Sequence, residues 1–254
     1  QGCWMGWERK RGKLEELNRR LRGEADGSFD LVTASESWLR SVRYVLTLDA
    51  DTELPRDAAR MLAATLAHPL NRPRVVRGRL VGGHAIVQPR VGTLPSSARR
   101  TLWSRVAATP TGLDPYTTAV SDVYQDLWGE GSFVGKGLYD VDAFRAALDG
   151  RVPPGRLLSH DLFEGILARS ALASDIEVLD EQPSSYEVGA ARLHRWIRGD
   201  WQLLPSLLRD ARDLGALGCW KILDNLRRSA IAPAVALACF VGWLGGARLA
   251  WAAT

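Results

Sequence analysis

Two aspartates separated by one residue, Asp49 and Asp51, have a spacing that suits metal chemistry. They directly follow the apolar, β-branched run 42–48, which predicts a buried strand. Open α/β sheets bind ligands at the carboxyl ends of strands, and hard divalent cations prefer oxygen ligands. We therefore predict that Asp49 and Asp51 bind Mg²⁺ or Mn²⁺. The alternative is that both are solvated loop residues or helix caps.

A second acidic pair, Asp161 and Glu164, lies in the segment SHDLFE, which predicts the start of a helix. Residues three apart share one helical face. A carboxylate there can take the proton from an attacking hydroxyl group. The alternative, which the spacing alone favours, is that both residues simply complement the positive end of the helix dipole.

A basic and aromatic segment, residues 192–201, contains Arg192, Arg195 and Trp196. Arginines can hold a diphosphate through several donors at once, and a tryptophan face can pack on the apolar side of a sugar ring. A competing interpretation is an interfacial helix that precedes a membrane span. The two interpretations are compatible.

Helical and extended patterns alternate along the chain and must position these groups. The predicted helices are 9–22, 55–67, 96–107, 141–148, 159–169 and 190–208, the last interrupted near Pro205. The predicted strands are 42–48, 84–88 (ended by Pro89) and 176–179, and the glycine-rich stretch 129–137 is a loop or kinked strand. This alternation predicts an α/β layered fold.

The stretch 229–247 contains 19 residues and no charge, close to the ~20 residues that cross a bilayer as a helix. Arg227 and Arg228 precede it and Arg248 follows it. We predict a transmembrane helix in contact with membrane lipid, preceded by an interfacial amphipathic segment at 209–228. A buried core helix is the alternative. The positive-inside tendency places the preceding domain in the cytoplasm.

The overall composition excludes several classes of protein. The 33 basic and 29 acidic residues give a net charge of +4 that is spread along the chain, so we expect no nucleic-acid partner. The three cysteines are far apart and form no CxxC motif, which argues against a structural zinc site or a disulfide scaffold. The chain begins at Gln1 rather than Met, and we expect it to be part of a longer protein.

In this order, the motifs resemble processive membrane β-glycosyltransferases such as cellulose and chitin synthases. Those enzymes carry a DxD motif, a later acidic base and a QxxRW motif before a membrane span, and Arg192 departs from the glutamine of that pattern. Longer strings resemble the glycosyltransferase domain of cyclic β-1,2-glucan synthases (glycosyltransferase family 84, related to family 2). They include WMGWERKRGKLEELNRRLRG, LTLDADTELP, AIVQPRV, GEGSFVGKGLYDVDAF, LSHDLFEG and HRWIRGDWQL.

This resemblance covers residues 4–208 and implies a GT-A-like, Rossmann-like mixed sheet flanked by helices over 1–208. It implies inverting transfer of glucose from UDP-glucose to a growing β-1,2-glucan at the bacterial inner membrane, with the catalytic domain cytoplasmic. The alternative is another processive enzyme of the cellulose- or chitin-synthase kind. The nucleoside-gripping strand of such domains would precede Gln1, which puts the activity of this chain on its own in question.

The resemblance also implies roles for individual residues. Asp161 would be the general base, while Asp49 and Asp51 would bind the metal and the donor phosphates. The residues implied in donor or acceptor binding are Lys13, Arg192, Arg195, Trp196, Gly135, Lys136 and Glu164. If the glucan starts on a protein side chain, the candidate tyrosines are Tyr116, Tyr124 and Tyr139.

Overall fold

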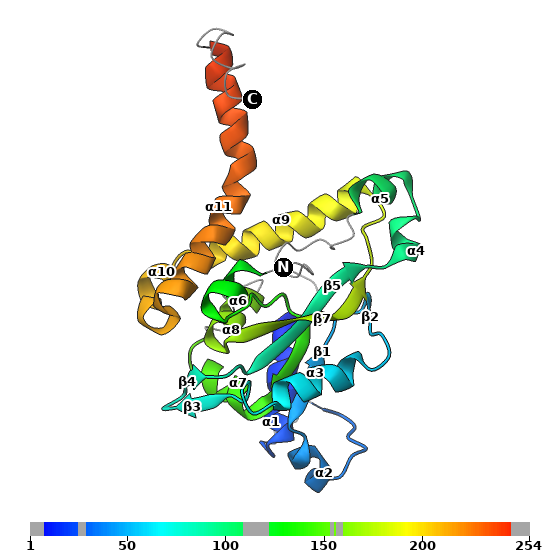
Figure 1. The fold of residues 1–254 in the computed structure, drawn as a ribbon, viewed down its shortest axis with the longest axis vertical. Helices are drawn as coiled ribbons and strands as arrows, with labels where there is room; N and C mark the ends of the chain where they lie inside the picture. The colour runs from blue at the N-terminus through cyan, green and yellow to red at the C-terminus, as the bar shows by residue number, and fades with distance from the viewer. Residues whose placement is uncertain (1–7, 25–28, 109–121, 153–154, 156–159, 245–254) are drawn as a thin grey trace. The chain divides into compact units, whose positions relative to one another are not determined.

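The computed structural model describes residues 8–24, 29–108, 122–152, 155 and 160–244. The chain divides into two compact units, Gln1–Leu193 and His194–Thr254. The first unit is built around a five-stranded sheet with the order β1-β6-β5-β7-β2 (Figure 1). Its strands are β1 (Tyr44–Thr47), β2 (Thr52–Glu53), β5 (Ile86–Thr93), β6 (Gly137–Asp140) and β7 (Ser170–Asp180).

The sheet is mixed, as expected. Strands β5 and β7 pair in parallel, whereas β1–β6, β6–β5 and β7–β2 pair antiparallel. Helices of the first unit are α1 (Arg9–Leu21), α2 (Glu36–Ser41), α3 (Ala58–Ala67), α4 (Pro95–Ala98), α5 (Leu102–Ala107), α6 (Val123–Trp128), α7 (Val141–Leu148) and α8 (Asp161–Leu167). The predicted α/β class is therefore confirmed.

The central strands β5 and β6 pack against a core cluster on each face of the sheet, and successive strand residues point to opposite faces. Ile86 and Tyr139 belong to the core cluster that includes residues of α1, α2 and α7. Their chain neighbours Val87 and Leu138 belong to a second cluster, which includes residues of α3. Helix α3 contacts β5, β6 and β7, and it lies across the sheet in Figure 1.

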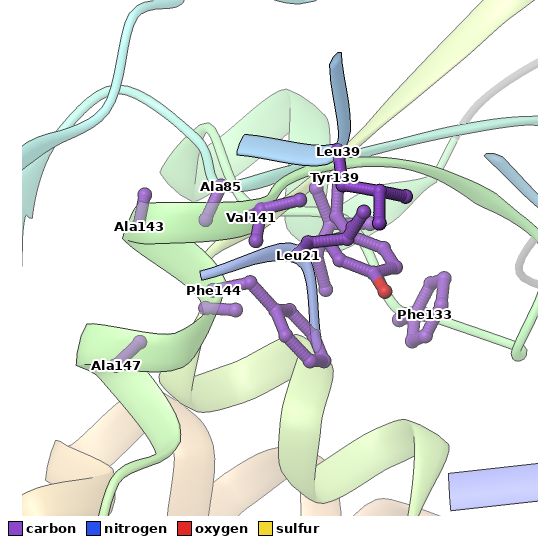
Figure 2. Close-up of a cluster of buried hydrophobic side chains, with 11 residues drawn as sticks. Leu21, Leu39, Ala85, Phe133, Tyr139, Val141, Ala143, Phe144 and Ala147 are labelled. Carbon is purple, nitrogen blue, oxygen red and sulfur yellow. The ribbon is translucent and has the colours of Figure 1, made fainter. Parts of the chain in front are cut away.

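The first core cluster joins α1 to the sheet (Figure 2). The rings of Tyr139 and Phe144 stack with their centroids 4.5 Å apart. The Tyr139 hydroxyl donates a hydrogen bond of 2.8 Å to the side chain of Asn18 on α1. Because Tyr139 is only 1% exposed, this bond satisfies a polar group that burial would otherwise leave unpaired. Helix α1 is thereby held against β6.

Several predicted boundaries were wrong; the helix predicted to begin at residue 190, for example, begins at Tyr186. The strand predicted to stop at Gln88 continues as β5 to Thr93, because Pro89 lies where the register with β7 shifts, and prolines are tolerated at such irregularities. The helix predicted over 96–107 is two short helices, α4 and α5. Thr101 begins α5 by accepting a hydrogen bond from the Ser104 backbone N–H in a capping box.

Strands β2, β3, β4 and β6 and the early start of β7 were not predicted. Strands β3 (Arg74–Val76) and β4 (Arg79–Gly82) form a hairpin, whose turn residues Arg77 and Gly78 both have positive φ, as hairpin turns favour. Strand β7 begins at Ser170, six residues before the predicted start. Its parallel pairing with β5 supplies the hydrogen bonds for this longer run.

The second unit contains the end of α9 (Tyr186–Gln202), α10 (Ser206–Arg209) and α11 (Ala211–Leu244). Two hydrogen bonds join α9 to α11: the Trp201 indole N–H donates to Ser229, and the Asn225 side chain donates to Asp200. Helix α11 is interrupted at Gly215, whose φ is +67° and ψ 177°. These contacts define the packing within this unit.

One helix in the described part of the chain is long and apolar enough to cross a membrane, Ala211–Trp243. Only 6% of its most apolar window is buried, which distinguishes it from the core helix of a soluble domain. Its exposed apolar side chains include Ile231, Val235, Leu237, Phe240, Val241 and Trp243. The predicted span 229–247 is helical as far as Leu244, and residues 245–247 lie outside the described residues.

Candidate functional site

Asp49 and Asp51 lie in the turn between β1 and β2, at the carboxyl end of β1 as the sequence predicted. The Thr52 backbone N–H donates to the Asp49 carbonyl at 3.1 Å, which closes this turn. At the end of β1, the Thr47 hydroxyl approaches the Gly135 and Gly137 carbonyls at 3.3 and 3.2 Å. The turn with the two aspartates is thus attached to the glycine-rich loop.

The Asp49 carboxylate is held by two ammonium groups. Lys10 Nζ lies 2.7 Å from Asp49 Oδ1, and Lys136 Nζ lies 2.7 Å from Asp49 Oδ2. Burial by itself would raise the pKa of Asp49, but Lys136 and Lys10 outweigh it and the pKa lies below its usual value. The side chain remains 41% exposed, so this charged carboxylate is accessible to a ligand from solvent.

Lys136 bridges two carboxylates. Besides Asp49, its ammonium contacts Asp180 Oδ2 at 3.0 Å, and the side chain is 10% exposed. Burial opposes the charge of Lys136, but Asp49 and Asp180 outweigh burial and raise the pKa above its usual value. Lys10 also donates to the Gly135 carbonyl at 2.7 Å. The ion pairs therefore connect α1, the aspartate turn, the glycine-rich loop and β7.

Asp51 has a cationic partner of its own. The Arg192 guanidinium, on α9, donates to Asp51 Oδ2 at 3.1 Å. Arg192 is the residue that departs from the glutamine of the wider family pattern, and here its side chain reaches the predicted metal motif. This contact brings the first residue of the RxxRW sequence to the aspartate turn.

Asp161 approaches the same loop from the other side. Gly135 has φ +85°, and a Cβ built on it would lie 2.9 Å from Asp161 Oδ1 and 3.0 Å from Asp161 Cγ. That separation is shorter than ordinary contact, so any larger residue at position 135 would push the Asp161 carboxylate away from the loop. The structure thus places Asp161, the predicted base, beside the loop that carries Lys136.

Two neighbours of Asp161, Glu164 and His160, are uncharged at neutral pH. Burial, assisted by Asp161, raises the pKa of Glu164 to about 8, so this side chain keeps its proton at pH 7. Burial and Arg11 lower the pKa of His160 to about 4, so the imidazole is neutral.

Four predicted binding residues remain: Glu164, Lys13, Arg195 and Trp196. Glu164 is 6% exposed, and its carboxyl lies 3.7 Å from the Arg11 guanidinium. Lys13 is exposed on α1. Arg195 and Trp196 belong to the second unit. The roles given to these four residues stay predictions.

Two of the three tyrosines that could carry the start of the glucan are buried. Tyr124 and Tyr139 are buried, and burial raises the pKa of the Tyr139 hydroxyl. A buried tyrosine cannot present its hydroxyl to a growing glucan in this conformation. Tyr116 lies outside the described residues.

Sequence reasoning missed Lys10 and Asp180. Lys10 lies one helical turn before Lys13, so the helical period of 9–22 offered a signal for it. Asp180 follows the predicted strand 176–179 directly, as Asp49 follows its own strand, and the same strand-end argument would have found it.

The aspartates suit a divalent cation that arrives with a phosphate ligand. Among the described residues, no group of three or more His, Cys, Asp or Glu side chains could hold a metal ion. Mg²⁺ usually takes one or two protein carboxylates and completes its shell with waters and substrate phosphates. Two partly exposed carboxylates at a strand end match that donor set.

Comparison with known proteins agrees with the sequence resemblance. No family model matches the chain. It is 51% identical over 247 residues to the cyclic beta-(1,2)-glucan synthase NdvB of Rhizobium meliloti (strain 1021). The match covers 96% of this chain but 9% of that protein. The chain is therefore similar to a segment that makes up about a tenth of a cyclic β-(1,2)-glucan synthase.

Proposed function

We propose that this chain is part of the catalytic domain of a glycosyltransferase that moves glucose from UDP-glucose to a growing β-1,2-glucan, with inversion at the anomeric carbon. The observation that carries the proposal is the meeting of Asp161 with Gly135, in the loop whose next residue, Lys136, pairs with Asp49. The 51% identity to a segment of a glucan synthase supports the same assignment. We further propose that the mixed sheet is of the GT-A type.

Asp161 would act as the general base. Its carboxylate would take the proton of the acceptor hydroxyl while that oxygen forms a bond to the anomeric carbon and the bond to UDP breaks. Because Glu164 keeps its own proton at neutral pH, it adds no second negative charge on this turn of α8. Gly135 provides room for the carboxylate against the loop.

The cations around the aspartates would hold the donor diphosphate. Lys136 and Arg192 lie on the two aspartates that follow β1, and charged donors of this kind bind phosphate strongly. Asp49 and Asp51 would hold Mg²⁺ or Mn²⁺, which when bound stabilises negative charge on the leaving diphosphate. Lys13, Arg195 and Trp196 remain proposed donor or acceptor contacts.

Helix α11 would anchor the enzyme in the inner membrane, with the catalytic domain on the cytoplasmic side. Its length, its apolar exposed side chains and the low burial of the helix support membrane association. The arginines Arg227 and Arg228, which precede the apolar stretch, favour the cytoplasmic orientation of the preceding domain.

The Asp161→Asn variant of the complete membrane protein tests the base. We expect glucose transfer to fall below detection while UDP-glucose binding, measured by calorimetry, stays within about twofold, because removing a group that acts in the transition state spares ground-state binding. Asp175→Asn is the matched control, since Asp175 lies on β7 with its side chain exposed. This control should keep its activity.

Normal glucan synthesis by Asp161→Asn would remove Asp161 from the role. Linkage analysis of the product made by the unaltered enzyme tests the acceptor. A β-1,2 linkage supports the proposal, and a β-1,4 linkage would move the chain to the cellulose- or chitin-synthase kind.

A further inference from the structure

Asp180 belongs to the same ion-pair cluster, yet neither the motifs nor the resemblance gives it a role. It is the last residue of β7. One carboxylate oxygen accepts a 2.7 Å hydrogen bond from the Thr52 hydroxyl, and the other lies 3.0 Å from Lys136 Nζ. The carboxylate is thus fixed by β2 on one side and paired with a lysine on the other.

The position of Lys136 creates a competition. Its ammonium lies 2.7 Å from Asp49 Oδ2, an oxygen that a divalent cation would also need. If Asp49 were the only carboxylate paired with the Lys136 ammonium, this ammonium would have to lose its partner before the metal could bind Asp49. Asp180 provides a second carboxylate for the same ammonium, so Lys136 can release Asp49 without becoming an unpaired buried charge.

The charges of the cluster balance before any ligand binds. Asp49, Asp51 and Asp180 carry three negative charges, while Lys10, Lys136 and Arg192 carry three positive ones. A divalent cation and a diphosphate with two negative charges add nothing to this sum when they bind together. Either one alone leaves the site with an excess charge of two.

We propose that Asp180 is a positioning residue, which holds Lys136 so that Asp49 can take up the metal when the donor diphosphate arrives. This inference rests on the proposed function of the aspartate site. Thr52 supports it structurally, because its hydroxyl orients the Asp180 carboxylate toward Lys136. Metal and nucleotide binding are then coupled, and each must strengthen the other by the same factor.

The test measures UDP binding by calorimetry in the complete protein as the Mg²⁺ concentration is varied. In Asp180→Asn, Lys136 keeps Asp49 as its charged partner, so the metal must compete harder. We expect the Mg²⁺ concentration for half-maximal UDP binding to rise about tenfold, which corresponds to about 1.4 kcal/mol. Asp175→Asn is the matched control on the same strand, because its side chain is exposed, and it should cause no change.

A second substitution separates positioning from a merely structural role. Lys136→Met in the Asp180→Asn background removes the competing ammonium, so the Mg²⁺ concentration for half-maximal UDP binding should return toward that of the unaltered protein, although UDP affinity at saturating Mg²⁺ falls because Lys136 also contacts the diphosphate in the proposed function. General damage to the fold would instead make the double variant worse than Asp180→Asn. An unchanged Mg²⁺ requirement in Asp180→Asn, or no recovery in the double variant, overturns the inference.

Thr52→Val keeps the inference testable if Asp180→Asn does not fold. It frees the Asp180 carboxylate from β2, and we expect a shift of about threefold in the same direction. No shift in this variant would also overturn the inference. If the unaltered protein binds no UDP at any Mg²⁺ concentration, the proposed function itself fails. If it binds UDP but the Mg²⁺ requirement does not change in Asp180→Asn, only the inference about Asp180 fails.

Discussion

Replacing Gly135 with alanine should impair transfer much more than folding. The added Cβ would lie 2.9 Å from Asp161 Oδ1 and 3.0 Å from Asp161 Cγ. Ordinary contact begins near 3.4 Å, so the carboxylate must retreat by about 0.4–0.5 Å. Misplacing a reacting group by about 1 Å can cost about a hundredfold in rate. We therefore expect kcat in Gly135→Ala to fall by about tenfold or more.

Gly129→Ala is the control that isolates this contact. Gly129 also has a positive φ, +66°, but a Cβ there would meet nothing within 4 Å. Both alanines carry the strain of a left-handed backbone, about 1–2 kcal/mol, so both variants should lose similar thermal stability. Glucose transfer from UDP-glucose and the temperature of half-inactivation would be measured for each. Equal losses of kcat in the two variants would refute the role assigned to the contact between Gly135 and Asp161.

Two further predictions concern the scaffold. Leu62→Ala should reduce the free energy of unfolding by about 2–5 kcal/mol, as large-to-small changes in cores do, because Leu62 is 0% exposed. A shift in the urea midpoint of less than about 0.5 M would contradict this. Folding raises the pKa of Glu164 from 4.5 to about 8, so the native state binds its proton more tightly and stability falls as the pH rises from about 4.5 to about 8. Glu164→Gln should flatten that part of the curve of unfolding temperature against pH, and an unchanged slope would show that Glu164 does not titrate there.

Local patterns were enough to predict the elements whose ends depend on nearby residues. Helix α7 covers 141–148 as predicted, because the Asp140 side chain accepts from the Ala143 backbone N–H at its first turn. The apolar, β-branched run before Asp49 forms strand β1, as its composition predicted. The composition of the apolar stretch that begins at Ser229 was enough to predict a long apolar helix.

Tertiary structure decided which side chains share the site. Lys10 contacts Asp49 although 39 residues separate them in the sequence. Lys136 contacts Asp180 because the strand order β6-β5-β7-β2 brings the loop before β6 close to the end of β7. Local periodicity carries no information about strand order. It predicted Glu164 on the same helical face as Asp161, but only the tertiary structure showed that Glu164 is buried, and that burial raises its pKa to about 8 although Arg11 opposes the rise. The sequence by itself determined the acidic motifs and their elements, whereas long-range packing determined their charge partners, because burial and ion pairs depend on contacts between distant segments.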